Sequence, residues 1–257
     1  MRELELSCLI DGRHCWPEHL ARVQHDRHLH VLHEMKRLGA AIGYAGKFLS
    51  HDDINRLSAE DAREACIAAR QSYDVDGIKT LYKEQLRISD QMWKDANDAP
   101  GAAPMRAAFA DLTVTGITIE EFREHATGGD SFHSNYARIN PDHYFLYGHE
   151  TGMRAMETFG MYGGPSEVNV ITDPDIKVPV ERETGFRLLT AGYTTLAGDG
   201  TDINVLAYHQ FKPLANGLAV RLGAFFPPKT PKDLVDGHAV HMAIEFWETS
   251  KLLAAAD

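Results

Sequence analysis

Two side chains near the end of this 257-residue chain have a spacing that suits metal binding. His241 and Glu245 are four residues apart in residues 230–256, TPKDLVDGHAVHMAIEFWETSKLLAAA, where Thr230 can cap a helix and Pro231 fits its first position. Residues four apart lie on the same helix face, one turn apart. An imidazole and a carboxylate so placed can share a divalent cation. A solvated helix face would show the same spacing, so the pair needs partners from elsewhere in the chain.

Two further residues, His143 and Glu157, supply such partners if their strands face the same way. His143 lies in DHYFLYG (142–148), and Glu157 lies in MRAMETFG (153–160), among apolar residues. A glutamate in that setting is unfavourable unless it faces solvent or has a partner. Together with the helical pair, these residues would form a site of two histidines and two carboxylates. Such a site suits Zn²⁺, with Mn²⁺ or Fe²⁺ as competitors, whereas each residue taken singly also fits a surface or core role.

A rival histidine cluster lies near the N-terminus, where seven of the 14 histidines precede residue 52. In HDRHLHVLHE (25–34), His25 and His28, or His30 and His33, are three residues apart and could chelate a metal on a helix. No second helix supplies the ExxH-type partner of helical di-iron sites. We therefore interpret this run as a solvated or interface face.

Composition excludes several classes of function. The formal net charge of −11 argues against binding to nucleic acid, and no apolar run is long enough to span a membrane. The N-terminus lacks the pattern of a secretory signal, and the three cysteines, Cys8, Cys15 and Cys66, lack zinc-ribbon or CxxC spacing. These features predict a cytoplasmic protein with reduced thiols. The phosphate-binding and serine-nucleophile motifs GxGxxG, GxxxxGK[ST] and GxSxG are absent, and so is HExxH.

The elements that must position the four residues divide the chain into two parts. Residues 1–100 are predicted to be mostly helical, with helices near 17–38, from Ser58 onward and over 77–96. The segment DANDAPGAAP (95–104) is typical of a linker. Residues 101–257 carry short strands and turns before the terminal helix. The strands are 142–148, 153–160, 166–172, two within 186–211 around a turn at Gly198-Asp199-Gly200, and 218–228. We expect an α+β fold in which a curved antiparallel sheet wraps around the last helix and leaves a cavity.

Several stretches of residues 116–253 also occur in a known family in the same order. These are GITIEEF, YARINPDH, METFG, ITDPD, AYHQFKPLANGLAVRLGAFF and HAVHMAIEF. In them the chain resembles the zinc-dependent diacetylphloroglucinol and phloretin hydrolase family. The resemblance implies a helical N-terminal region, serving as a lid or for dimerisation, and a helix-grip, Bet v 1-like domain with the metal in its cavity.

The resemblance also assigns roles to individual residues. It implies that the metal ligands are His143, Glu157, His241 and Glu245, and that His209 and Tyr136 face the substrate. Because the segment between His143 and Glu157 is short, Glu150 and Glu167 compete with Glu157 for its place.

The implied reaction is metal-dependent hydrolysis of a carbon–carbon bond between an acyl group and a polyhydroxylated aromatic ring. The expected partner is a small aromatic or polyketide-like substrate, and the expected assembly is a homodimer. Two alternatives stay open. One is a helix-grip protein that binds an aromatic or polyketide ligand without turnover, and the other is a metal-dependent polyketide cyclase or dehydratase.

Overall fold

The computed structural model describes residues 2–97, 103–127, 135–160 and 164–255. The N-terminal part holds four short strands and five helices: β1 (Glu5–Ile10), β2 (Arg13–His14), α1 (Pro17–Arg37), β3 (Gly43–Tyr44), β4 (Lys47–Phe48), α2 (His51–Ile54), α3 (Ala59–Gln71), α4 (Val75–Leu81) and α5 (Lys83–Asn97). In the described residues, the C-terminal part holds the remaining strands, short helices between β5 and β6, and the terminal helix. In chain order these are β5 (Arg106–Thr115), α6 (Ile119–Thr127), α8 (Tyr136–Ile139), β6 (His143–His149), β7 (Gly152–Glu157), β8 (Ser166–Thr172), β9 (Leu188–Leu196), β10 (Asp202–Leu214), β11 (Gly217–Phe226) and α9 (Lys232–Ala255).

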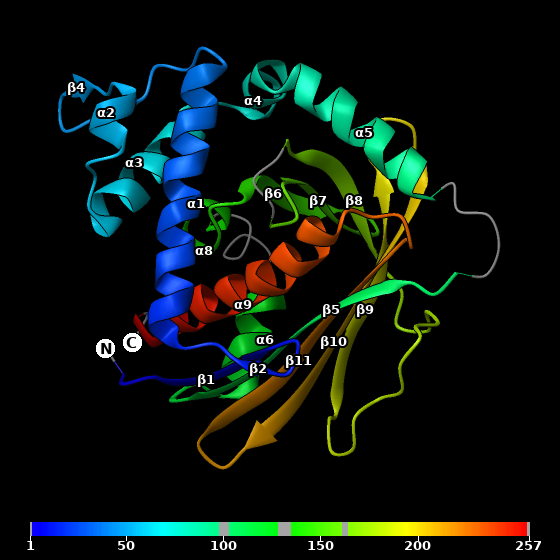
Figure 1. The fold of residues 1–257 in the computed structure, drawn as a ribbon. Helices are drawn as coiled ribbons and strands as arrows, with labels where there is room; N and C mark the ends of the chain where they lie inside the picture. The colour runs from blue at the N-terminus through cyan, green and yellow to red at the C-terminus, as the bar shows by residue number, and fades with distance from the viewer. Residues whose placement is uncertain (1, 98–102, 128–134, 161–163, 256–257) are drawn as a thin grey trace.

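One large antiparallel sheet dominates the fold, and it corrects the predicted architecture. Its nine strands run in the order β2-β1-β5-β11-β10-β9-β8-β7-β6, with helices supplied by both ends of the chain (Figure 1). The predicted helix-grip, Bet v 1-like domain built from residues 101–257 is therefore wrong. The N-terminal part, predicted to be mostly helical, contributes β1 and β2, and β1 pairs with β5 over its whole length. This pairing satisfies backbone groups of β5 that would otherwise form an open sheet edge.

The terminal helix α9 lies along one face of the sheet, where it contacts β5, β11 and β1 (Figure 1). Alternate residues of β5 point into this layer, so Ala108, Ala110, Leu112 and Val114 are buried. They belong to a core that also contains Ala239, Ala243 and Ile244 of α9 and other apolar residues of the sheet. Every second side chain of the strand faces the helix, and the helix presents small residues to it, so the two layers can approach closely. Gly237 lies within α9 and does not interrupt it.

A second core joins the N-terminal helices to the far end of the sheet. Tyr144, Phe145 and Met156 of β6 and β7 pack with buried residues of α1 and α3, such as Leu32 and Ala65. The end of the sheet that carries His143 is thus packed against the N-terminal helices. The helix predicted over 77–96 is two helices, because α4 ends at Leu81 and α5 begins at Lys83. Part of the predicted linker, 98–102, falls outside the described residues.

The strands nearest the candidate ligands match their predicted positions closely. The prediction over 166–172 coincides with β8, and the turn predicted at Gly198-Asp199-Gly200 separates β9 from β10.

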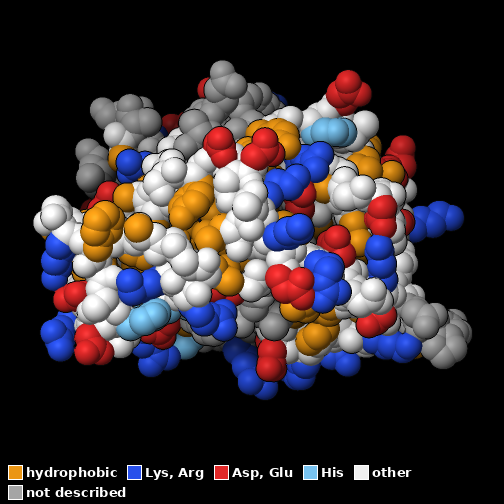
Figure 2. Space-filling view, turned by 90° about the horizontal axis from the view of Figure 1, so that it is seen from above, with side chains coloured by type: hydrophobic (Ala, Val, Ile, Leu, Met, Phe, Trp, Pro, Cys, Tyr) orange, Lys and Arg blue, Asp and Glu red, His pale blue; other side chains and the backbone are white. Residues whose placement is uncertain are grey.

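Within the described residues, no helix is both long and apolar enough to cross a membrane. On the surface seen from above, acidic and basic side chains are interspersed with hydrophobic ones (Figure 2).

Candidate metal centre

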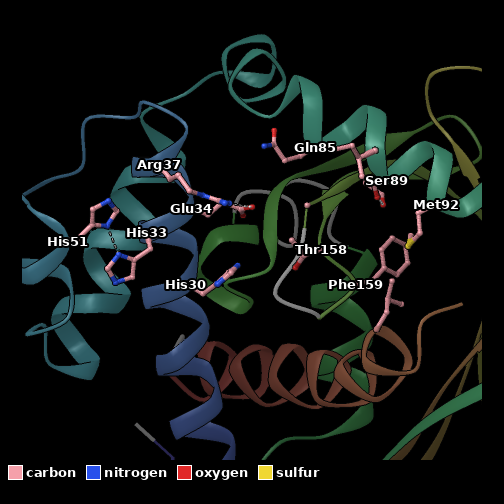
Figure 3. A pocket seen from close by; sticks show the side chains of 14 residues that line it. His30, His33, Glu34, Arg37, His51, Gln85, Ser89, Met92, Thr158 and Phe159 are labelled. Atoms are coloured by element: carbon pink, nitrogen blue, oxygen red, sulfur yellow. Dashed lines mark hydrogen bonds and ion pairs between the residues drawn. The ribbon is translucent and has the colours of Figure 1, made fainter.

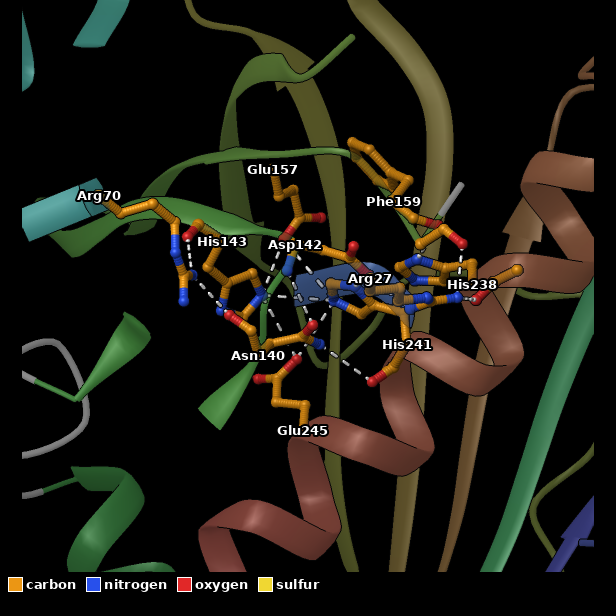
Figure 4. Close-up of polar contacts among 12 residues, drawn as sticks. Arg27, Arg70, Asn140, Asp142, His143, Glu157, Phe159, His238, His241 and Glu245 are labelled. Carbon is orange, nitrogen blue, oxygen red and sulfur yellow. Dashed lines mark hydrogen bonds and ion pairs between the residues drawn. The ribbon is translucent and has the colours of Figure 1, made fainter. Parts of the chain in front are cut away.

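The four predicted ligands converge at the point where β6 and β7 meet α9 (Figure 4). His143 begins β6 and Glu157 ends β7, and the two residues are directly paired across these antiparallel strands. His241 and Glu245 face them from successive turns of α9. The two imidazoles are almost fully buried, whereas the side chain of Glu245 is 27% exposed. Solvent therefore reaches the cluster from the Glu245 side.

The distances between the donor atoms are those of a metal site. His143 Nε2 lies 3.2 Å from Glu157 Oε2, 3.3 Å from His241 Nε2 and 3.7 Å from Glu245 Oε2. His241 Nε2 lies 3.4 Å from Glu245 Oε2 and 3.9 Å from Glu157 Oε2. Four nitrogen or oxygen ligands arranged as a tetrahedron around zinc are separated by roughly 3.3 Å. The buried cluster of His143, His241 and Glu245, whose ligand atoms all lie within 4.8 Å of one another, could hold a metal ion. Glu157 lies within 4 Å of both imidazoles but is not part of that mutually close group.

A buried carboxylate orients one of the two imidazoles. Asp142 Oδ2 accepts a hydrogen bond from His241 Nδ1 at 3.1 Å, so Nε2 is the ring nitrogen that faces the other ligands. The same oxygen accepts a hydrogen bond from Arg27 Nη1 at 2.5 Å. Asn140 donates to the backbone carbonyl of His241 and accepts from the amide of Asp142. A carboxylate behind a ligating histidine is the usual way in which proteins hold the ring and raise its basicity.

The arginine in this arrangement, Arg27, comes from α1. Its Nη2 donates to the carbonyl oxygens of Gly160, at 2.6 Å, and Gly237, at 2.9 Å. It thereby ties the segment that follows β7 to the first turns of α9. Gly160 has a φ of +83°, and a Cβ atom there would lie 2.3 Å from the carbonyl oxygen of Gly237 and 2.7 Å from Cβ of His241. Glycine is thus required at this crossing both by its backbone conformation and by the close approach.

A second buried arginine, Arg70 of α3, holds the segment that leads into His143. Its guanidinium donates to the carbonyl oxygens of Ala137, Asn140 and His143. A buried carbonyl without a partner is costly, so these bonds hold the segment in place. Both His143 and Asp142 are therefore positioned by side chains of the N-terminal helices.

The protonation of the cluster reflects the charges packed together within it. Burial alone would lower the pKa of His241, but hydrogen bonds to Asp142 and Glu245 outweigh it and raise the pKa to about 10. Burial would raise the pKa of Glu245, but the hydrogen bond from His241 and the charge of His143 hold it at about 2. Burial would also raise the pKa of Glu157, but the hydrogen bond from His143 outweighs it and lowers this pKa. The ligand carboxylates are thus ionised at neutral pH, as metal binding requires, whereas a metal ion would have to displace the proton that His241 holds.

Of the two residues expected to face the substrate, His209 lies near this centre, whereas Tyr136 is placed only against the neighbouring core. His209, on β10, is close enough to Glu245 for the carboxylate charge to act on it, but burial dominates and lowers its pKa to about 4. Its Nδ1 is buried without a hydrogen-bond partner among the described residues. Tyr136 begins α8 and packs against the core that contains α9. Burial raises the pKa of its hydroxyl.

The two carboxylates that compete with Glu157 lie elsewhere. Glu150 is exposed in the turn between β6 and β7. Glu167 lies on β8, where Lys79 and Arg154 pair with its carboxylate. Neither contacts His143 or His241 in the described part of the chain, whereas Glu157 lies within 4 Å of both rings.

The N-terminal histidines do not form a second centre. Among the described residues, only His143, His241 and Glu245 form a group of three or more side chains close enough to bind one ion. His28 is buried, and its burial together with the charge of Arg70 lowers its pKa to about 3. His33 contacts the His51 ring through their Nδ1 atoms at 2.7 Å.

Sequence reasoning did not identify Asp142, Arg27 and His238. Asp142 directly precedes His143 in the PDH stretch, and this adjacency is the sequence feature that could have indicated its role. His238 stacks on His241 with ring centroids 4.9 Å apart, and its Nδ1 lies 3.1 Å from the carbonyl oxygen of Phe159. Burial lowers its pKa to about 3, so it is a neutral neighbour of the cluster.

Comparison with known proteins does not assign this chain to a family. A scan against models of protein families gives no match, and a search of curated proteins gives none either.

Proposed function

We propose that this protein is a metal-dependent hydrolase that cleaves the carbon–carbon bond between an acyl group and a polyhydroxylated aromatic ring. The observation that carries the proposal is the convergence of His143, Glu157, His241 and Glu245 from two strands and one helix. The reaction class comes from the resemblance of residues 116–253 to the diacetylphloroglucinol and phloretin hydrolases. The substrate class is accordingly a small acylphenol or related aryl ketone.

Zn²⁺ is the metal we propose, with Mn²⁺ and Fe²⁺ as the competing ions. Two imidazole nitrogens and two carboxylate oxygens are a donor set that zinc accepts, and each imidazole lies within 4 Å of both carboxylates. The buried Asp142 behind His241 is the outer support expected of a metal-bound histidine. A bound metal ion would supply Lewis-acid polarisation of the acyl carbonyl and lower the pKa of water.

The chemistry of the bond limits what the remaining residues must do. Hydrolysis adds the oxygen of water to the acyl carbon, and the broken bond leaves its electron pair on a ring carbon, which then takes a proton. The ring can leave in this way because its hydroxyl groups stabilise the carbanion. His209, kept neutral by burial, and Tyr136, kept protonated, would hydrogen-bond the ring oxygens and hold the proton that the ring carbon needs.

The decisive experiment compares two single-histidine variants. His241→Ala removes a proposed ligand, whereas His149→Ala removes an exposed histidine from the far end of β6. Both proteins would be analysed for metal content and for release of acetate and trihydroxybenzene from acetyl-1,3,5-trihydroxybenzene. We expect the first variant to lose the metal and the activity and the second to retain both. Full metal content and turnover in His241→Ala would overturn the assignment.

Metal analysis and product assays of the wild-type protein distinguish the proposed hydrolase from the alternative functions. Stoichiometric metal with release of both products supports the hydrolase. Stoichiometric metal without cleavage of any acylphenol would instead favour cyclase or dehydratase chemistry. A pure protein without metal would favour a ligand carrier.

A further inference from the structure

A cavity of about 620 Å³ lies between α1, α5 and the end of β7 (Figure 3). None of the four proposed metal ligands lines it. Thr158 and Phe159, which directly follow Glu157, do line it. The cavity is therefore a separate space whose wall continues the chain segment that carries one of the ligands. Its volume falls in the range of small-molecule sites, roughly 300–1,000 Å³.

One end of this cavity is polar. Arg37, His30 and His33 reach it from α1, and His51 reaches it from α2 (Figure 3). Both ring nitrogens of His33 already contact His51 and Asn55, so Arg37 is the donor on which a ligand would depend. The Arg37 side chain is 68% exposed, and its contact with Glu34 is long at 3.5 Å. Most of the five N–H donors of this guanidinium are thus free to bind an anion.

The other end is apolar. Ile88 and Met92 from α5 form its wall together with Phe159 and Leu234. Ile88 is 54% exposed, which leaves a large apolar side chain uncovered at the rim. The Phe159 ring is supported from behind by Trp93, at a centroid distance of 5.2 Å. A flat apolar group entering the cavity would cover Ile88 and pack against a rigid aromatic wall.

One acidic group, Glu34, also lines the cavity, but its charge is weakened. Glu34 is buried, and burial raises its pKa. Its Oε2 faces the hydroxyl groups of Tyr82 and Tyr144, and its Oε1 faces Arg37. The carboxyl group is thus turned toward partners of its own and leaves the Arg37 guanidinium as the charged group that a ligand meets.

We propose that this cavity is a binding site for an aromatic monocarboxylate, with the carboxylate held by Arg37 and the ring held against Met92 and Phe159. Charge-assisted hydrogen bonds anchor one end of the ligand and apolar burial holds the other. The site does not depend on the reaction proposed above, since no metal ligand takes part in it.

Binding would be tested on metal-free protein, so that no carboxylate can coordinate a metal. The probe is 3-phenylpropionate, and its uncharged counterpart is 3-phenylpropan-1-ol, both measured by isothermal titration calorimetry. Arg37→Gln removes the anion-binding group. Arg87→Gln is its matched control, because Arg87 is also 68% exposed, also pairs with a glutamate three residues away, and lies outside this cavity. Ile88→Asp places a negative charge at the apolar rim.

We expect the acid to bind about tenfold more tightly than the alcohol, as a charged hydrogen bond implies. Arg37→Gln should weaken binding of the acid about tenfold, and so should Ile88→Asp, while Arg87→Gln should leave it unchanged. The proposal is overturned if the acid does not bind at millimolar concentration. Equal binding of the acid and the alcohol would also overturn it, and so would equal effects of Arg37→Gln and Arg87→Gln. None of these outcomes bears on metal binding at the other site, so the two proposals fail independently.

Discussion

Replacing Arg27 by glutamine should weaken metal binding, although Arg27 belongs to an N-terminal helix and, within the described part of the chain, hydrogen-bonds Asp142, Gly160 and Gly237 rather than a proposed ligand side chain. Its guanidinium donates to Asp142, and Asp142 in turn accepts from Nδ1 of His241. Without Arg27, Asp142 keeps its burial but loses its positive partner. The His241 ring would then lose the support that orients Nε2 toward the metal.

The size of the effect follows from the burial of this pair. The side chains of Arg27 and Asp142 are 4% and 3% exposed. Removing one partner of a buried ion pair costs about 3–5 kcal/mol of stability. Loss of an outer partner of a metal-bound histidine lowers metal affinity about 10–100-fold. We therefore expect Arg27→Gln to raise the Kd for zinc by that factor and to lower the free energy of unfolding.

The assay is competition for zinc against a chromogenic chelator, alongside urea unfolding of the metal-free protein. Arg22→Gln is the control, because Arg22 lies on the same helix and is exposed. Asp142→Asn and the double variant with Arg27→Gln complete a mutant cycle, in which the two changes should be strongly non-additive. An Arg27→Gln protein that unfolds cooperatively and binds zinc with unchanged affinity would refute the reasoning, and so would additive effects in the cycle.

Three further outcomes follow from the structure. Glu157→Gln should weaken zinc binding more than about 100-fold, because loss of a ligand costs at least as much affinity as loss of the residue behind a ligand. The control variant Glu150→Gln should bind zinc like the wild type. Equal affinities of the two variants in a chelator competition would rule out Glu157 as a ligand. Gly160→Ala should destabilise the fold by at least about 1–3 kcal/mol in urea unfolding, since φ is +83° and the added Cβ meets backbone; unchanged stability would contradict this. Burial raises the pKa of Glu34 in the folded protein. Ionisation of this carboxyl therefore opposes folding once the pH rises above the ordinary pKa of a glutamate. Glu34→Gln should therefore be more stable than the wild type at pH 7, with a difference that shrinks toward pH 4, and a difference that does not change with pH would argue against the shift.

Local patterns predicted the elements that carry the site. The span predicted for β8 is the observed one, and the turn at Gly198-Asp199-Gly200 is correct. The terminal helix was predicted because Thr230 and Pro231 mark its start, and its 3.6-residue period places His241 and Glu245 on adjacent turns. Each of these inferences uses residues that are neighbours in the sequence.

The sheet topology was not predictable in the same way. The pattern of residues 5–10 is that of a short strand, but nothing local indicates that β1 pairs with β5, about a hundred residues later. Without that pairing, the C-terminal part was expected to form a helix-grip domain by itself. The pairing of β1 with β5 arises from long-range backbone hydrogen bonds, which leave no periodic signal at either strand.

The spacing of His241 and Glu245 is therefore what the sequence alone determined about the candidate centre, since helix geometry depends only on residues a turn apart. Tertiary structure decided the rest. The register of β6 and β7 places His143 opposite Glu157, and the packing of α9 brings His241 to within 3.3 Å of a ring 98 residues earlier. Arg27, which holds Asp142 behind the His241 ring, precedes Asp142 by 115 residues. Such contacts result from the packing of whole elements, and that packing depends on the complete set of buried surfaces rather than on any one stretch of the chain.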